Sequence, residues 1–219
     1  MDTKEILQLN RLYFLKSVWT RLRLRWDLIL LAWIVLCLFC GGIWYGSRWI
    51  SPQEQSARKT LVQTAQNYLG CNESDGSHEK IIDAYNAFEP NPRDYKVTHE
   101  DNWCATFGSA VALEAGMTDI IPMECSCEQQ INLFKALDCW QEDECYLPHT
   151  GDYIYYVWDE WRSGDCTAWA DHVGIVVDTF GPVIQVIEGN KDDAVEYRYI
   201  FVNDICIRGF GLPDYKKSE

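Results

Sequence analysis

Residues 172–187 read HVGIVVDTFGPVIQVI, which is two apolar runs joined by a Gly-Pro turn. Val and Ile favour strands, whereas Gly and Pro favour the turns between strands. We therefore predict two successive strands at His172–Val177 and Val183–Ile187. Further runs of this kind lie at Tyr153–Val157, Tyr197–Val202 and Ile205–Arg208. The second half of the chain is expected to form an antiparallel sheet.

The residues before this sheet have a helical pattern instead. After Ser51-Pro52, apolar residues recur about four positions apart in a run that ends at Gly70, and Pro is typical of a first helical turn. Ile81–Phe88 is a shorter helix-like run stopped by prolines. Cys104–Ala115 predicts a mostly buried helix closed by a glycine. Helices followed by an antiparallel sheet describe an α+β domain.

The N-terminal part of the chain has a different composition. Residues 28–45 read LILLAWIVLCLFCGGIWY, 18 residues without a charge, and a helix of this length spans about 27 Å of bilayer. The residues before it carry a net charge of +3, and the residues after it carry 13 basic and 30 acidic groups, net −17. Because the basic flank of a membrane helix stays in the cytoplasm, the C-terminal part is expected to face outward.

These features divide the chain into four parts. We predict a basic cytoplasmic segment at 1–27, a single-pass transmembrane signal anchor at 28–46, a linker with N-terminal helices at 47–95, and a catalytic core at 96–219. A cleaved signal peptide would have a shorter charged region, and a buried core helix would rarely have a basic flank. We expect the protein in the cell membrane, with an extracellular domain.

Composition excludes other classes of protein. Apolar residues make up 47% of the chain, which favours a packed core over disorder. The formal net charge is −14, and no basic stripe follows the N-terminal segment, so nucleic-acid binding is not expected.

Cys104 is the first candidate for chemistry. It falls in the first turn of a predicted helix, where the helix dipole lowers the pKa of a thiol and favours the nucleophilic thiolate. A cysteine nucleophile also needs a base, and His172 begins an apolar strand that would fix its position. The next strand ends with Glu188 and Asn190, and either is placed to orient the imidazole. The alternative is a small buried cysteine and a structural histidine.

These residues lie within four ordered motifs. The motifs are DNWCATF at 101–107, GDYIYY at 151–156, DHVGIV at 171–176 and VIEGN at 186–190. Together they resemble the CHAP family of cysteine, histidine-dependent amidohydrolases and peptidases, bacterial relatives of the NlpC-like and papain-like enzymes. The resemblance runs from about Ala57 to Tyr215. One departure is Gly108, where the family has a bulkier aliphatic residue, and a looser nucleophile helix is expected there.

The resemblance implies a papain-like fold, in which N-terminal helices pack on a central antiparallel sheet. It implies that Cys104 is the nucleophile, His172 the general base and Glu188 the residue that orients His172. Asn190 is a further polar member of the site. The implied reaction is hydrolysis of an amide in peptidoglycan, within the stem peptide or between sugar and peptide. No cofactor is expected, because thiol acyl transfer needs none.

Three further residues flank these motifs. Trp103 adjoins Cys104, and Trp169 and Asp171 precede His172. We predict that they bind substrate, with core packing as the alternative for each tryptophan. The acidic runs lack the spacing of a calcium loop and are expected to be a solvated face.

Seven cysteines outside the apolar segment have no catalytic role in this interpretation. Cys139 and Cys145 enclose a short loop and are candidates for a disulfide. With Cys125 and Cys127 they are also candidates for a thiolate metal site, but the spacing lacks the usual Cys-x-x-Cys pairs, so no metal is expected. Free thiols are the third alternative.

The sequence therefore predicts a membrane-anchored hydrolase of peptidoglycan, either an endopeptidase or an N-acetylmuramoyl-L-alanine amidase. One alternative is a cysteine endopeptidase that acts on a surface protein. Another is a catalytically silent module for cell-wall binding or assembly. A place in a larger envelope complex stays open, with partners unknown.

Overall fold

The structure is a computed structural model that describes residues 19, 29–36, 50–143, 145–158 and 168–217. It contains two compact units, Met1–Ile50 and Ser51–Glu219. In the first unit, residues 29–36 are helical, whereas the rest of the predicted anchor at 28–46 and nearly all of segment 1–27 lie outside the described residues. Among the helices described, none has the length and apolar character needed to cross a membrane.

The second unit has the predicted order of helices before strands. Its α-helices are α2 (Pro52–Gln66), α3 (Glu79–Asn86), α4 (Cys104–Glu114) and α5 (Cys127–Ala136). Its strands are β1 (Trp140–Gln141), β2 (Tyr153–Tyr156), β3 (His172–Phe180), β4 (Val183–Lys191), β5 (Ala194–Phe201) and β6 (Ile207–Gly211), and a short 3-10 helix η1 (Tyr215–Lys217) follows. The α+β prediction is confirmed, while α5 and β1 were not predicted.

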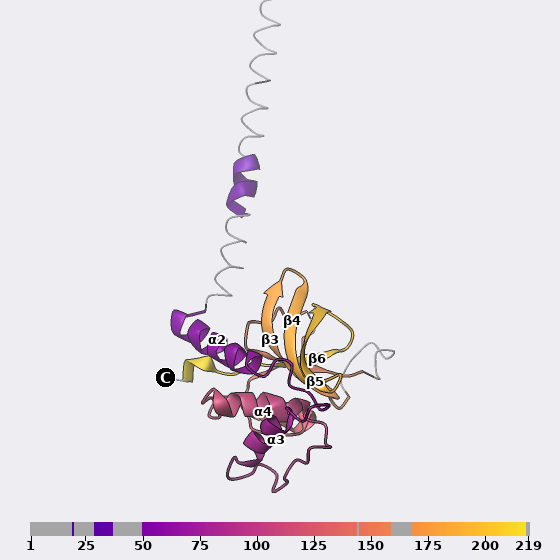
Figure 1. Ribbon diagram of the computed structural model, residues 1–219. Coiled ribbons are helices and arrows are strands. Elements are labelled where there is room, and N and C mark those ends of the chain that lie inside the picture. The colour runs from indigo at the N-terminus through magenta and orange to yellow at the C-terminus, as the bar shows by residue number, and fades with distance from the viewer. Residues whose placement is uncertain (1–18, 20–28, 37–49, 144, 159–167, 218–219) are drawn as a thin grey trace, which may run out of the picture. The chain divides into compact units, whose positions relative to one another are not determined.

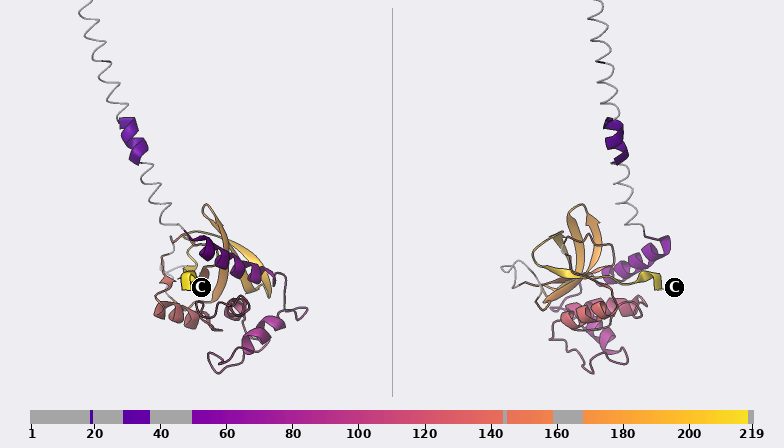
Figure 2. Two further views of the ribbon diagram at one scale, coloured as in Figure 1. Left: turned by 90° about the vertical axis from the view of Figure 1, so that its left-hand side faces the viewer. Right: turned by 180° about the vertical axis from the view of Figure 1, so that it is seen from behind.

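The six strands form one sheet in the order β1-β6-β2-β3-β4-β5. Every neighbouring pair is antiparallel, as predicted. Strands β3, β4 and β5 follow one another through short turns, and β6 returns to pair with β2. Helices α3 and α4 lie together below the sheet, and α2 runs beside it (Figures 1 and 2).

The core has two parts because both faces of the sheet are covered. Strand β2 reads YIYY, and all four side chains are fully buried. Successive side chains of a strand point to opposite faces. Tyr153 and Tyr155 therefore pack with the helices, whereas Ile154 and Tyr156 join a second cluster formed with β3, β4, β5 and β6.

Helix α4 is held against β2 at Gly108. A Cβ atom added there would lie 2.9 Å from Cε1 of Tyr153, and the Tyr153 hydroxyl donates to the Gly108 carbonyl at 2.8 Å. The expectation that Gly108 loosens the helix is therefore wrong, because the tyrosine ring fills the space that a larger side chain would take. This contact fixes α4, which begins with Cys104, relative to the sheet.

A buried ion pair ties α2 to the sheet. Ser51 caps the helix by accepting from the Glu54 N–H at 3.1 Å, and Pro52 stands in the first turn as predicted. From the middle of α2, Arg58 donates to Asp152 at 2.7 Å and to Glu54 at 3.0 Å. Asp152 is fully buried directly before β2, so the pair connects the helix to a central strand.

Candidate active site

Cys104 is the first residue of α4 and is only 6% exposed. Residues Ala105 to Ala112 of this helix are buried, so the core holds the helix in place. The first N–H groups of any helix lack partners within it, and they carry the positive end of the helix dipole. The predicted nucleophile thus stands at an electropositive helix terminus.

His172 is the first residue of β3, and its imidazole lies between two groups of opposite character. Its Nε2 lies 3.1 Å from Oε2 of Glu188, a fully buried carboxylate on β4. Because Nε2 is engaged there, Nδ1 is the ring nitrogen left for the Cys104 thiol, which interacts electrostatically with His172. The structure therefore brings the predicted nucleophile, base and orienting carboxylate together in that order.

Gly174 makes the His172–Glu188 contact possible. A Cβ atom at this position would lie 2.7 Å from Cγ of Glu188 and 2.4 Å from a methyl of Val186. Any side chain on Gly174 would therefore displace β4 or the glutamate. With glycine there, the Glu188 side chain is able to cross β3 and reach the imidazole.

Cys104, His172 and Glu188 stabilise one another's charged forms. Burial would lower the pKa of His172, but hydrogen bonds and charge from Cys104 and Glu188 outweigh it and raise this pKa to about 9. Burial would raise the pKa of Glu188, but hydrogen bonds from His172 and Arg198 keep it below its usual value. At neutral pH the pair is thus a charged imidazolium and carboxylate.

Cys127 also belongs to the site, although its place there was not predicted from the sequence. It is the first residue of α5 and is 7% exposed, and its sulfur lies 3.6 Å from that of Cys104. The hydrogen bond from Cys127, with further help from His172, holds the pKa of Cys104 well below that of an ordinary thiol despite burial. The same hydrogen bond, together with burial, raises the pKa of Cys127 well above its usual value. The thiolate is therefore Cys104.

Aromatic rings and an arginine complete the wall beside His172. Tyr156 stacks on Trp158 with 5.0 Å between ring centroids, and it also stacks on His172 at 6.0 Å. Arg198 donates to both oxygens of Glu188, at 2.7 and 2.9 Å, and its guanidinium lies over the Trp158 ring. The sequence gave no local signal for Arg198, because its role depends on the pairing of β5 with β4.

These groups border a hollow of about 240 Å³. Its lining residues are Trp158, His172, Asn190, Lys191, Asp192 and Arg198. Lys191 is paired with Asp192 at 2.6 Å and with Glu196 at 2.9 Å, and Arg198 is paired with Glu188. The hollow is therefore polar, and its cations are already matched by carboxylates.

The remaining predicted site residues are distributed around this centre. Asn190 lines the hollow, and its side-chain amide lies 3.3 Å from Oδ1 of Asn102. Trp169 is 73% exposed just before β3 and is not among the residues that line the hollow. The Asp171 carboxylate accepts from the backbone N–H of Trp158 at 2.8 Å, so it holds the strand end that carries this ring.

Trp103 does not lie where a substrate contact was predicted. Its side chain has no exposed surface, and its indole N–H donates to Glu73 at 2.9 Å. It packs in the core directly before α4, with its ring 5.7 Å from that of His78. Burial of the large ring stabilises the loop that delivers Cys104, so the core-packing alternative fits this residue.

Two other features lie apart from the Cys104 site. The thiols of Cys139 and Cys145 are free, and the described residues contain no cluster of three or more His, Cys, Asp or Glu side chains able to hold a metal ion.

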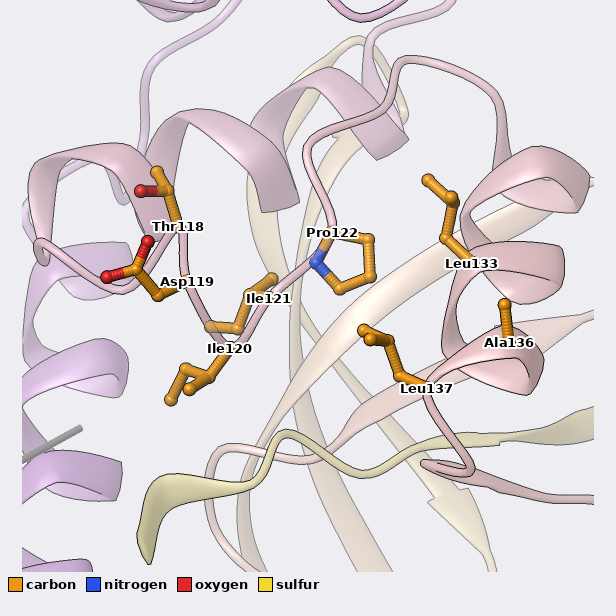
Figure 3. Close-up of a pocket in the computed structure, with 8 residues that line it drawn as sticks. All are labelled: Thr118, Asp119, Ile120, Ile121, Pro122, Leu133, Ala136 and Leu137. Carbon is orange, nitrogen blue, oxygen red and sulfur yellow. The ribbon is translucent and has the colours of Figure 1, made fainter. Parts of the chain in front are cut away.

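A mainly apolar hollow lies between residues 118–122 and the C-terminal end of α5 (Figure 3). Its side chains include Ile121, Pro122 and Leu133.

Comparison of the chain with models of known protein families found no match, and comparison with curated proteins also found no match.

Proposed function

We propose that this chain is a cysteine hydrolase of amide bonds. The observation that carries the proposal is the alignment of Cys104, His172 and Glu188 at the meeting point of α4, β3 and β4. A thiol at a helix terminus, next to an imidazole that is itself held by a carboxylate, is the arrangement that acyl transfer requires. The carboxylate behind the histidine helps to keep the buried imidazole charged, which supports a catalytic role for it.

The reaction follows from these positions. The Cys104 thiolate attacks the amide carbonyl, and N–H groups at the start of α4 stabilise the oxyanion. Protonated His172 then gives its proton to the leaving amine, which departs and leaves a thioester on Cys104. Neutral His172 next accepts a proton from water as the water attacks the thioester. The acid is released, and the thiolate and imidazolium are restored.

The substrate class and the location of the protein rest on the sequence. The ordered motifs resemble the CHAP family, which supports an amide in peptidoglycan as the substrate. The uncharged residues 28–45 and their basic flank support a single-pass anchor with the hydrolase outside the cell. The polar hollow beside His172 is suited to a peptide that carries both charged and neutral groups.

The test is digestion of structurally defined muropeptides by the full-length chain in detergent, with products identified by mass spectrometry. Wild type is expected to release new amine and carboxyl termini, and Cys104→Ala is expected to release none. Cys125→Ala is the matched control, because this cysteine lies outside the proposed reaction. Cleavage by folded Cys104→Ala at the wild-type rate would overturn the mechanism. Cleavage of a surface protein but not of muropeptides would keep the mechanism and reject the substrate.

A further inference from the structure

We propose that Cys104 and Cys127 form a reversible disulfide that switches the hydrolase off under oxidising conditions and protects its nucleophile. The switch rests on the proposed function, whereas the disulfide itself does not. The two thiols are separate in the structure described here, which is the reduced state of the pair.

Geometry is the first support for the disulfide. The two sulfurs are already 3.6 Å apart, and a disulfide bond is about 2.05 Å long, so an approach of about 1.5 Å is enough. Each cysteine is the first residue of its helix, α4 or α5. The two helix starts are therefore close neighbours, and their thiols are in contact.

The second support is the difference between the two thiols. The hydrogen bond from Cys127, with further help from His172, lowers the pKa of Cys104 and so favours the thiolate, which is the form that reacts with oxidants. Cys127 stays protonated and contacts that thiolate directly. A reactive thiolate with a second thiol in contact is the arrangement of a cysteine that is oxidised and then resolved by its neighbour.

A hydroperoxide is the oxidant that fits the site. Both sulfurs are buried to more than nine-tenths, so a small oxidant has better access than a bulky disulfide. The Cys104 thiolate attacks one peroxide oxygen, which yields a sulfenic acid and releases hydroxide. Cys127 then loses its proton and attacks the sulfenic sulfur, and the sulfenic oxygen leaves as hydroxide. The two protons that the thiols lose combine with the two hydroxide ions. Overall, two thiols and one hydrogen peroxide become one disulfide and two water molecules.

Cys125 is the competing partner to consider, because it is only two residues from Cys127. Its backbone N–H donates to the Glu124 carboxylate at 2.8 Å, and no hydrogen bond joins its thiol to that of Cys104, which contacts Cys127 instead. Burial and the charge of Glu124 raise the pKa of Cys125. Cys125 is therefore the matched control, because it is the same residue type two positions before Cys127 but has no hydrogen bond to the nucleophile.

The experiment treats the reduced full-length chain in detergent with hydrogen peroxide, blocks the remaining thiols with iodoacetamide and maps the cysteines by peptide mass spectrometry. Wild type and Cys125→Ser are expected to yield one linked peptide pair that joins Cys104 to Cys127. Their hydrolytic activity is expected to be lost and then restored by dithiothreitol. In Cys127→Ser, Cys104 is expected to reach the sulfinic state, and dithiothreitol is expected to restore nothing.

Two results would overturn the disulfide. One is a peroxide-treated wild type in which Cys104 and Cys127 are both still blocked by iodoacetamide. The other is a link from Cys104 to a different cysteine. The peptide map needs no substrate and no variant, so it decides the disulfide even if the hydrolase proposal fails or Cys127→Ser does not fold. A linked wild type that keeps its full activity would reject the switch alone.

Discussion

His172 carries the positive charge on which the proposed chemistry depends. Its imidazolium lies between the Cys104 thiolate and the Glu188 carboxylate, and these neighbours raise its pKa to about 9 although burial opposes the charge. A histidine with a raised pKa stabilises the folded state fully below its unfolded pKa of about 6.5. That contribution is lost as the pH rises through about 9. Stability and catalysis therefore have the same alkaline limit.

The first prediction is that activity declines in alkali as His172 loses its proton, with a midpoint near pH 9. Glu188→Gln removes the carboxylate that helps to keep the imidazole protonated, so the midpoint is expected to move to lower pH. The variant is also expected to lose up to roughly 10⁴-fold in rate, the size of the loss when the carboxylate that orients a catalytic histidine is replaced by its amide. The measurement is kcat/KM from pH 5 to 10 for both proteins.

A control for Glu188→Gln must keep the fold and change a nearby carboxylate outside the pair. Glu196→Gln serves this purpose, because Glu196 lies on β5 and contacts Lys191 rather than His172. Its alkaline midpoint is expected to match that of wild type. An unchanged midpoint in Glu188→Gln would contradict the assignment of Glu188 as the positioning residue.

Some members of the site could be predicted from the sequence and others could not, for a physical reason. Cys104 and His172 begin a helix and a strand, and local patterns predict where elements begin. Cys127 also begins a helix, but its contact with Cys104 joins residues 23 apart in the chain. Arg198 reaches Glu188 across the β4–β5 pair. Contacts of this kind depend on how elements pack, which one sequence does not specify.

At the scale of elements, the position of α4 depends on a close approach to β2. Tyr153 is fully buried, its ring packs on Phe134 with centroids 5.8 Å apart, and its hydroxyl bonds to Gly108. The ring is therefore held on both sides and cannot move aside. This rigidity determines what an added methyl group does at Gly108.

The second prediction is that Gly108→Ala lowers the free energy of unfolding by about 1 kcal/mol. Alanine is favoured in a helix by about 1 kcal/mol, but overpacking against a fixed ring costs about 1–3 kcal/mol. The measurement is urea-induced unfolding of the full-length chain. In a Tyr153→Leu background the ring is absent, so the same substitution is expected to become stabilising. Destabilisation of equal size in both backgrounds would show that the ring is not the cause.

The third prediction concerns the attachment of α2. Arg58→Met leaves the buried Asp152 carboxylate without its cation, and breaking a buried ion pair in this way costs about 3–5 kcal/mol. Lys59→Met is the matched control, because its side chain is exposed on the same helix and little change is expected. Both are measured by urea-induced unfolding. A loss below about 1 kcal/mol in Arg58→Met would show that the pair adds little to α2 docking.

The elements themselves were predictable to different degrees. Helices α2, α3 and α4 and strands β2 to β6 have clear periodicity or β-branched runs, and the structure confirms them within a few residues. Helix α5 has apolar residues only at Cys127, Ile131 and Phe134 on its buried face, among polar neighbours. Strand β1 has two residues and exists only through its pairing with β6. Weak periodicity and dependence on a partner strand explain both omissions.

At the scale of the whole molecule, the net charge of the C-terminal part determines whether a charged polymer is attracted or repelled as it approaches. The residues after Tyr45 carry a net charge of −17. The cations beside the proposed site do not offset it, because Lys191 and Arg198 are each paired with carboxylates. A polymer that carries phosphate or carboxylate groups is therefore repelled at long range, so the proposed hydrolysis of an anionic wall would depend on short-range contacts.

The fourth prediction is that salt improves hydrolysis of an anionic wall polymer. Raising the ionic strength from about 0.01 M to about 0.15 M shortens the Debye length from about 30 Å to about 8 Å, which screens the repulsion but leaves contacts within the hollow largely intact. KM for intact, negatively charged wall is expected to fall over this range, with kcat nearly constant. An uncharged amide substrate of the same linkage is the control, and its KM is expected to stay constant. If KM for the charged wall rose with salt instead, a cationic docking surface would have to outweigh the net charge, and attraction rather than repulsion would govern the encounter.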